Sequence, residues 1–527
     1  MRETPMSYGG MVTAPHHLAS QAGRYVLEQG GTAIEATIAM AAALAVVYPH
    51  MTGLGGDGFW LVAHKGEAPR GIDASGTAVG AATLDRYAGL DVIPQRGVMA
   101  ANTVAGTVGG WQLAREISGE RHQPLPLRTL LAPAIQYATD GFAVSRSQEE
   151  LTRTHLGVLA PVPGFSRTYL DAGAVPRIGT RMRMPRLADT LETLAEEGLD
   201  GFYRGRLAER ISRDMAGVGG MVTVDDLAGW HACEVTPLSV AMRDGSRLYN
   251  LPAPTQGMAS LAILGVSDRL EQGASESFTQ VHGLIEATKR AFIQRDALIG
   301  SPELSGDLAG PLQISALSAE AAKIDMMRAA PWPHRAEPGD TIWCGAVDSH
   351  GTMVSFIQSI FFEFGSGVVL GETGLTWQNR GSSFQLGSGG PRGLAPGRKP
   401  FHTLNPAFAD LACGRRMSYG TMGGEGQPQT QAVVFSRHVR HGVGLQEAIT
   451  RPRWLLGRTW GTVATNLKVE ADLGDELIAA LRAAGHDLEI VPPHSGMMGH
   501  AGALVLHPDG LIEGATDPRS DGAVVAI

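Results

Sequence analysis

The stretch Pro338-Gly-Asp-Thr-Ile-Trp-Cys-Gly-Ala-Val-Asp348 places a polar turn directly before an apolar strand in the middle of the chain. Thr341 is predicted to be the first residue of that strand. If the bond between Asp340 and Thr341 is cut, Thr341 gains a free α-amino group beside its own hydroxyl. One residue then supplies both the nucleophile and the base that activates it. A threonine that opens a strand is usually structural, so the rest of the chain must decide whether this one reacts.

The composition of the 527-residue chain indicates a compact protein with mixed helices and strands. Its 69 glycines and 30 prolines are scattered singly, and no linker or low-complexity run divides the chain. The net charge of −9 argues against nucleic-acid binding and leaves no basic face for a membrane. No histidine or cysteine spacing typical of a metal site appears, so we expect neither a metal nor an organic cofactor.

Two features indicate the compartment. The first ten residues contain no apolar run of the kind found in secretion signals. The three cysteines (Cys233, Cys344 and Cys413) are far apart and odd in number, which fits a reducing environment better than a disulfide framework. We therefore expect a cytoplasmic protein.

Hydrophobic periodicity predicts most of the secondary structure. The tetrapeptide Asp348-Ser-His-Gly351 between two apolar runs is a hairpin signal. With helices mostly before Thr341 and strands mostly after it, the pattern favours helices packed on a mixed or antiparallel sheet. Helices are predicted over residues 18–29, 32–47, 130–139, 189–197, 207–215, 280–299, 445–450 and 475–484, and strands over 60–64, 341–347, 352–357, 432–435, 501–506 and 512–515.

A glycine-rich turn, Met51-Thr-Gly-Leu-Gly-Gly-Asp-Gly-Phe59, precedes the first of these strands. Such a loop can cradle a phosphate, but no GK[ST] helix or acidic ribose partner follows it. Close packing of backbone is the better interpretation.

Short motifs follow one another in a characteristic order along nearly the whole chain. Any one of them is weak, but in this order they resemble the γ-glutamyltransferase family of N-terminal-nucleophile hydrolases. The matching segments are Gly9–His16, Gly53–Phe59, Ala105–Gly110, Ala132-Pro133 with Gly141-Phe142, the helix positions His282, Glu286, Lys289, Arg295 and Asp296, and then Phe364–Gly367, Gly420–Gly424 and Asp517–Ser520.

The resemblance implies an α+β fold, a four-layer αββα sandwich formed jointly by two fragments of one precursor. Self-cleavage would leave a large fragment, 1–340, and a small one, 341–527, in one intertwined unit. The implied partners are a small amide substrate, water and the two fragments themselves, and a dimer of processed heterodimers is one assembly that the resemblance allows.

The resemblance also implies roles for four residues. Thr341 aligns with the nucleophile, and Ser359 aligns with a threonine whose hydroxyl bonds that nucleophile. Gly423 and Gly424 align with the pair whose backbone N–H groups hold the oxyanion, a role that suits glycine because the backbone can approach closely. Taken without the resemblance, Gly423-Gly424 would be interpreted as an ordinary tight turn.

The chain departs from the family where a glutamate moiety would be held. Ser75 stands at the position of the arginine that binds the α-carboxylate. Phe361, Arg380 and Ser383 replace the asparagine, glutamine and aspartate that grip the amino-acid end, and His402-Thr403 replaces a serine pair. The segment from Gln385 to Lys399 is also short where many relatives carry a lid, which favours water as the acceptor and hence hydrolysis.

Arg380 could compensate for the lost anchors, because its guanidinium can bind one carboxylate with two hydrogen bonds. Phe361 would shorten the pocket, so the substrate is expected to be a small amide with a nearby carboxylate. The smallest is oxamate, and the branch of the family that hydrolyses oxamate to oxalate and ammonia in purine breakdown is the one this chain resembles most. An alternative for Arg380 is a surface ion pair with Glu372 or Glu363.

Other interpretations stay open from the sequence. His402 could contact the substrate or the leaving ammonia, or could be a loop hydrogen-bonder. A second enzyme hypothesis is a γ-glutamyl or glutaryl-type acylase that uses Arg380 for a distal carboxylate. A third is an inactive binding or scaffold protein, against which the intact set of Thr341, Ser359, Gly423 and Gly424 argues.

Overall fold

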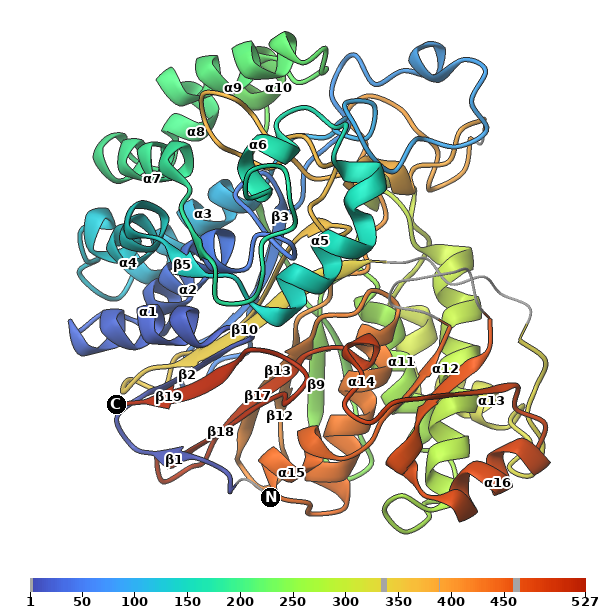
Figure 1. The fold of residues 1–527 in the computed structure, drawn as a ribbon. Coiled ribbons are helices and arrows are strands. Elements are labelled where there is room, and N and C mark those ends of the chain that lie inside the picture. The colour runs from blue at the N-terminus through green and yellow to red at the C-terminus, as the bar shows by residue number, and fades with distance from the viewer. Residues whose placement is uncertain (1–2, 333–338, 388, 458–464) are drawn as a thin grey trace.

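The computed structural model describes residues 3–332, 339–387, 389–457 and 465–527 (Figure 1). Pro338 of the opening segment lies outside these ranges. Two seven-stranded sheets stack face to face, and helices cover both outer faces. The expected four-layer αββα sandwich of an α+β protein is therefore confirmed.

The first sheet is antiparallel throughout. Its strands in spatial order are β1 (Met6–Ser7), β18 (Ile512–Thr516), β17 (Ala501–Leu506), β13 (Arg416–Thr421), β12 (Ala407–Asp410), β9 (Arg247–Asn250) and β8 (Leu238–Ala241).

The second sheet is also antiparallel throughout and carries the strand that contains Thr341. Its strands in spatial order are β19 (Ala523–Ala526), β2 (Met11–Ala14), β10 (Asp340–Val347), β11 (Met353–Phe361), β3 (Asp57–Ala63), β4 (Arg70–Ala74) and β7 (Cys233–Val235).

The central pair of the second sheet, β10 and β11, lies between β2 and β3. Strands from before and after position 341 are therefore combined in one sheet, and the same holds for the first sheet. The expectation that strands lie mostly after Thr341 holds only in part, since β2, β3, β4, β8 and β9 all precede it. Several of these strands are short or buried on both faces, so they lack the alternating pattern that marks a half-exposed strand.

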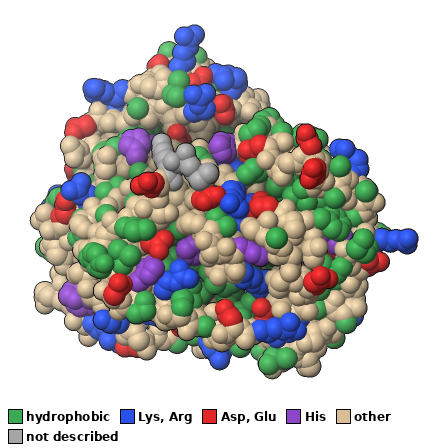
Figure 2. Space-filling view, turned by 90° about the horizontal axis from the view of Figure 1, so that it is seen from below, with side chains coloured by type: hydrophobic (Ala, Val, Ile, Leu, Met, Phe, Trp, Pro, Cys, Tyr) green, Lys and Arg blue, Asp and Glu red, His purple; other side chains and the backbone are tan. Residues whose placement is uncertain are grey.

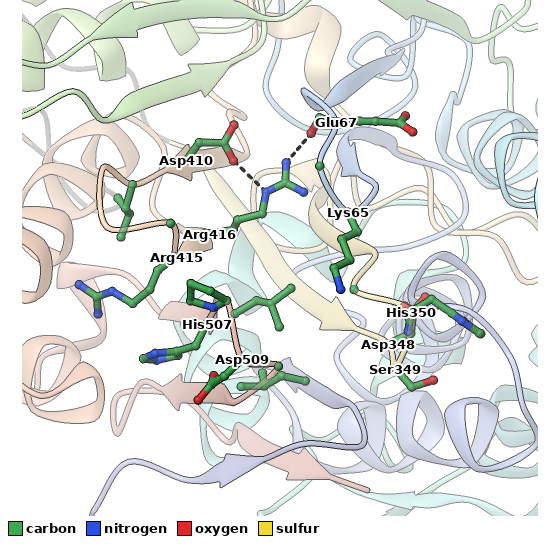
Figure 3. Close-up of a pocket in the computed structure, with 18 of the residues that line it drawn as sticks. Lys65, Glu67, Asp348, Ser349, His350, Asp410, Arg415, Arg416, His507 and Asp509 are labelled. Carbon is green, nitrogen blue, oxygen red and sulfur yellow. Dashed lines mark hydrogen bonds and ion pairs between the residues drawn. The ribbon is translucent and has the colours of Figure 1, made fainter.

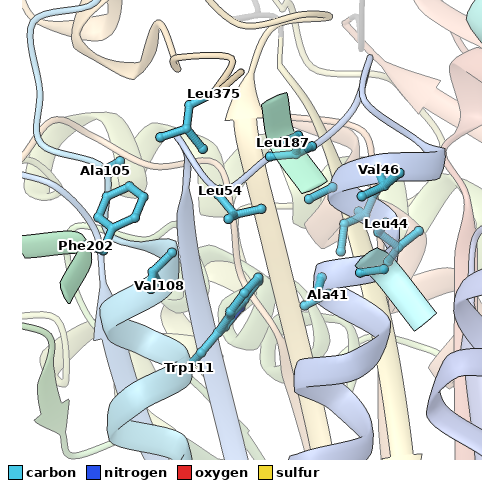
Figure 4. Close-up of a cluster of buried hydrophobic side chains, with 14 of the residues drawn as sticks. Ala41, Leu44, Val46, Leu54, Ala105, Val108, Trp111, Leu187, Phe202 and Leu375 are labelled. Carbon is cyan, nitrogen blue, oxygen red and sulfur yellow. The ribbon is translucent and has the colours of Figure 1, made fainter. Parts of the chain in front are cut away.

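One helical layer covers the second sheet. Helix α2 (Ala33–Val47) is buried along its whole length and begins with a capping box between Thr32 and Glu35. Figure 4 shows side chains of α2 and α3 packing onto this sheet, with Trp111 near the centre. The other helices on this side are α1 (His17–Glu28), α3 (Thr107–Gly119), α4 (Leu127–Asp140), α5 (Arg146–Leu159), α6 (Phe165–Tyr169), α7 (Pro185–Glu197), α8 (Gly201–Arg204), α9 (Arg206–Gly217) and α10 (Val224–Ala228).

The other helical layer covers the first sheet and consists of α11 (Gly257–Ser267), α12 (Phe278–Leu298), α13 (Ile314–Ala321), α14 (Gly426–Phe435), α15 (Leu445–Thr450) and α16 (Asp475–Ala483). The strand predicted over residues 432–435 is wrong, because these residues end helix α14. That helix is buried along its whole length, so its apolar residues show no helical period. The other predicted helices and strands are confirmed, with ends shifted by a few residues. Small additional sheets pair β14 (Trp454–Leu456), β15 (Leu467–Glu470) and β16 (Leu488–Val491), and β5 (Phe142–Ala143) with β6 (Arg181–Met182).

The two sheets approach each other closely around Trp343 of β10. A Cβ atom at Gly420 would lie 2.2 Å from Cδ1 of this indole, and one at Gly502 would lie 2.4 Å from its Cζ3. Glycine at both positions lets β13 and β17 accommodate the ring.

None of the helices in the described parts of the chain is long and apolar enough to cross a membrane.

Candidate active site

Thr341 lies in β10, in the middle of the second sheet, one residue after the strand begins at Asp340. Its side chain is buried, and its Oγ1 has no hydrogen-bond partner among the residues that the structure describes. The chain runs unbroken through the Asp340–Thr341 bond, and the Thr341 N–H donates to Asp340 Oδ1 at 2.9 Å. This placement leaves the hydroxyl available to act as a nucleophile on the neighbouring carbonyl.

Ser359 on β11 contacts the carbonyl that precedes Thr341. Its hydroxyl donates to Asp340 O at 2.5 Å and accepts from Phe361 N–H at 2.7 Å. The pairing of β10 and β11 is irregular here, between Asp340 and Ile342. In the unbroken chain Ser359 thus touches the Asp340 carbonyl, whereas the sequence predicted a bond to the Thr341 hydroxyl.

The carboxyl group of Asp340 is in a low-dielectric place. Burial, reinforced by the nearby Glu363, raises its pKa well above the usual value for an aspartate. Glu363 itself is held by Arg96, which also bonds the Glu363 and Gly365 carbonyls. This shift favours the protonated form of the Asp340 carboxyl over the charged one.

The loop from β13 to α14 brings Gly424 against Gly339, the residue before Asp340, with Gly423 beside it. Gly423 and Gly424 both have positive φ, +124° and +51°, which favours glycine. A Cβ atom at Gly424 would lie 3.0 Å from the backbone N and O of Gly339, so side chains are excluded by contact as well. The loop opens helix α14, whose N-terminus adds partial positive charge.

Helix α12 holds this loop through a chain of hydrogen bonds. Arg295 donates to Gln256 Oε1 at 3.1 Å and pairs with Glu425 at 2.8 Å. The Gln256 amide in turn donates to the carbonyls of Gly424 and Thr403, at 2.8 and 2.6 Å. Gln256 was not singled out in the sequence, because its role depends on contacts with residues well over a hundred positions away.

Arg380 begins a short 3₁₀ turn, Arg380–Ser383, and is 1% exposed. Its guanidinium carbon lies 3.6 Å from the ring centroid of Phe361. The surface ion-pair alternative for Arg380 is wrong, since the residue is buried. Of the two partners considered for it, Glu372 pairs with Arg213 and Glu363 with Arg96.

Phe361 and Ser383 flank the arginine in different ways. Phe361 stands opposite Asp340 in the β10–β11 ladder and has a φ of +80°, a conformation that is strained for a bulky residue. The Ser383 hydroxyl donates to the carbonyls of Arg380 and Phe401, at 2.9 and 3.2 Å, so here it braces the turn.

His402 and Thr403 are both buried. The imidazole is fully buried and its Nε2 is 3.2 Å from Asp57 Oδ2. Burial, with a further contribution from Arg380, lowers the pKa of His402 to about 4, although Asp57 acts in the opposite direction. A Cβ atom at Gly339 would lie 3.1 Å from the Thr403 hydroxyl, which places this pair against the residue before Asp340.

Ser75 occupies the position where the resemblance led us to look for an arginine. Its hydroxyl donates to Asp73 Oδ1 at 2.5 Å, and Lys399 pairs with the other Asp73 oxygen at 2.7 Å. Lys399 therefore already has a carboxylate partner within the chain, namely Asp73. The contact with Asp73 could not be foreseen from the sequence, since 326 positions separate Lys399 from it.

A buried trio on α12 and near β16 has the composition of a metal site. Its members are His282, Glu286 and His486. The two imidazoles hydrogen-bond each other at 2.9 Å, and Glu286 accepts from Lys289 Nζ at 2.7 Å. These contacts already use the ligand atoms, and the ammonium would repel a cation, so the trio is interpreted as structural.

The cavity in Figure 3 lies at the opposite end of the sandwich from Thr341, roughly 20 Å away by the rise of a strand. It has a volume of about 630 Å³ and is lined by the turns that join β3 to β4, β10 to β11, β12 to β13 and β17 to β18. Arg416 bonds Asp410 on the neighbouring strand and also donates to the backbone carbonyls of His64 and Glu67. The face shown in Figure 2 mixes positive and negative side chains without a continuous field of either sign.

Comparison with known proteins agrees with this architecture. The gamma-glutamyltranspeptidase family model matches residues 19–527. The oxamate amidohydrolase proenzyme of Klebsiella pneumoniae is 53% identical over 99% of both chains. The glutathione hydrolase-like YwrD proenzyme of Bacillus subtilis is 39% identical over 98% of both. The crystal structure of cephalosporin acylase from Bacillus halodurans superposes with a TM-score of 0.90 at 32% identity, covering 100% of this chain and 97% of that one. The chain is therefore an enzyme of the gamma-glutamyltranspeptidase family that acts on amide bonds.

Proposed function

We propose that this protein is a self-processing threonine amidohydrolase that cleaves itself between Asp340 and Thr341 and then hydrolyses a small carboxylated amide, with oxamate as the leading candidate. The observation that carries the substrate class is the buried Arg380 stacked on Phe361. Because Phe361 stands opposite Asp340 in the ladder, the guanidinium lies one side chain away from the cleavage position.

Self-cleavage begins with attack of the Thr341 hydroxyl on the carbonyl carbon of Asp340. Ser359 supports this step, since its hydroxyl donates to the oxygen that becomes negative. The resulting ester is hydrolysed by water, which leaves residues 1–340 and 341–527. The fragments stay together because both contribute strands to both sheets.

In the mature enzyme the new α-amino group of Thr341 takes the proton of its own hydroxyl. The oxygen attacks the carboxamide carbon of the substrate, and the N–H groups of Gly423 and Gly424 hold the oxyanion. Ammonia leaves with the transferred proton, and water then releases oxalate from the acyl-threonine. Arg380 holds the adjacent carboxylate, while Phe361, Ser383 and Thr403 limit the size of the site.

The resemblance to an enzyme named as an oxamate amidohydrolase supports the choice of substrate, and the absence of the usual glutamate anchors supports it independently. A second candidate, a γ-glutamyl or glutaryl-type acylase, is favoured by the close superposition on a cephalosporin acylase. The two differ in the distance from Thr341 at which the substrate carboxylate is bound.

The test is a comparison of substrates with purified, processed protein. We expect ammonia release from oxamate with kcat/KM far above that for glutaryl amides, and little or no turnover of γ-glutamyl-p-nitroanilide. Robust turnover of the γ-glutamyl or glutaryl substrate with no ammonia from oxamate would reject the assignment in favour of the acylase.

A further inference from the structure

The carboxylate of Asp57 is held from one side by three donors. Its Oδ1 accepts from the Gly76 N–H at 2.9 Å, the Gly106 N–H at 3.1 Å and the Gln378 Nε2 at 2.9 Å. Its other oxygen, Oδ2, faces His402 Nε2 at 3.2 Å. Three hydrogen bonds to one oxygen fix which way the carboxylate points.

Asp57 and His402 both lie close to residues that contact the Asp340–Thr341 segment. Asp57 stands directly opposite Ser359 in the β3–β11 ladder, so the two side chains share a face of the sheet. The guanidinium of Arg380 is near enough to the imidazole to lower the pKa of His402. The following residue, Thr403, packs against Gly339.

The orientation of Asp57 determines which nitrogen of His402 carries the proton. A carboxylate can only accept, so Nε2 must be the protonated nitrogen and Nδ1 the acceptor. The Nε2 contact is not a well-formed hydrogen bond in this structure, and Nδ1 has no partner among the described residues. Catalytic hydrogen bonds are often long before substrate binds and tighten with it. The low pKa of His402 keeps the ring neutral at working pH, which an acceptor requires.

We propose that His402 Nδ1 accepts a hydrogen bond from the carboxamide NH₂ of the substrate, and that Asp57 is the positioning residue that fixes the accepting tautomer. The pair then selects amides over esters and acids, which offer no N–H donor at that place. This inference rests on the proposed function, because it assigns the amide end of a substrate whose carboxylate Arg380 holds. A site built to accept such a donor rejects analogues that lack it.

Asp57→Asn provides a sharp test because it is isosteric. The three donors keep the amide oxygen of the new side chain at the Oδ1 position, so its NH₂ must face His402 Nε2. That nitrogen must then accept, and the proton moves to Nδ1. In selectively ¹⁵N-histidine-labelled enzyme we expect the protonated nitrogen of His402 to change from Nε2 to Nδ1, with the signal assigned by its loss in His402→Asn.

The kinetic readout is the ratio of kcat/KM for oxamate to that for monoethyl oxalate, which keeps the carboxylate but has no N–H. We expect Asp57→Asn and His402→Ala to lower this ratio by about 10-fold or more, as loss of one substrate hydrogen bond does. His402→Asn, whose amide oxygen can take the place of Nδ1, should recover part of the ratio. His64→Asn, a buried histidine near the far cavity, is the matched control and should leave the ratio unchanged.

Two results would overturn the inference. One is an unchanged Nε2 tautomer in Asp57→Asn. The other is a loss of activity in His402→Ala that is equal for the amide and the ester, which would indicate structural damage alone. If the wild-type enzyme releases no ammonia from oxamate, the proposed function fails, whereas the tautomer experiment still decides whether Asp57 sets the state of His402.

Discussion

In the proposed mechanism, self-processing depends on Thr341 and the carbonyl of Asp340. The hydroxyl is buried without a partner among the described residues, and the carbonyl oxygen is already bonded by Ser359. The precursor therefore holds the two reacting groups next to each other before any chemistry, which reduces the entropy that the reaction must lose.

Thr341→Ala removes the nucleophile, so the variant should remain a single chain. Thr341→Ser keeps a hydroxyl at the same place and should still split into two fragments. A denaturing gel of each purified protein is the measurement. Cleavage of the alanine variant at the 340–341 bond would contradict the mechanism.

Ser359→Ala removes a donor from the carbonyl that is attacked. Loss of one oxyanion donor typically slows a reaction by roughly 100- to 1,000-fold, so self-cleavage should slow by at least about 10-fold even if water partly replaces the hydroxyl. The rate is read from the two fragments on a gel at successive times after synthesis. Ser349→Ala, on the exposed turn at the far end of β10, should cleave at the normal rate.

Arg380→Ala leaves the substrate carboxylate without its partner. Losing a buried charge-assisted pair costs on the order of 2–5 kcal/mol, and each 1.4 kcal/mol is about tenfold, so kcat/KM for oxamate should fall by roughly 30-fold or more. Self-cleavage should be largely intact, because it involves no substrate carboxylate. The control is Arg213→Ala, an exposed arginine paired with Glu372. Unchanged kinetics in Arg380→Ala would move the carboxylate site elsewhere.

At the scale of elements, the position of β10 depends on how closely the two sheets approach. Trp343 is only two residues from Thr341, and its ring occupies the space left by Gly420 and Gly502 on the facing strands. Gly420 and Gly502 thus affect the position of Thr341 through the packing of the Trp343 side chain.

Gly420→Ala places a methyl group where the indole stands, so either Trp343 or β13 must move. Overpacking of this kind costs about 1–3 kcal/mol of unfolding free energy, and we expect slower self-cleavage as well. The matched variant is Gly157→Ala in α5, where nothing lies within 4 Å of the new Cβ. It should stabilise the protein by up to about 1 kcal/mol. Urea unfolding of both variants checks the prediction, and an unperturbed Gly420→Ala would contradict the packing argument.

At the scale of the whole molecule, four buried histidines make stability depend on pH. Burial lowers the pKa values of His16 and His486 to about 3 and those of His402 and His500 to about 4. Each ring is neutral in the folded chain but takes up a proton near pH 6.5 once unfolded. Their contribution is fully present above pH 6.5 and is lost as the pH falls toward 4, because the unfolded state then binds more protons.

We therefore expect the urea midpoint of the single-chain Thr341→Ala variant to fall between pH 7 and pH 5. Each histidine contributes about 1.4 kcal/mol per pH unit within its window. In the same background, His500→Gln should make the pH dependence less steep. A midpoint that does not change over this range would show that the buried rings stay protonated or become exposed.

The sequence by itself determined the strand start at Thr341, most of the long helices and the order of motifs that identifies the family, because these depend on neighbouring residues and on periodicity along the chain. It also singled out Arg380 and His402 as departures from the usual glutamate site. It missed the end of α14, where burial on all sides removes the helical period, and it missed strands β2, β4, β8 and β9, which are short.

Only the tertiary structure decided what these residues touch. It buried Arg380 on the ring of Phe361, placed Ser359 on the Asp340 carbonyl, and brought Asp57 to His402 across 345 positions of sequence. The glycine-rich turn that carries Asp57 indicated only close packing. The role of Asp57 could not be predicted from it, because the three donors and His402 come from other parts of the chain. Hydrogen bonds and ion pairs act over a few ångströms in space, and the sequence alone does not record which distant residues the fold will bring within that range.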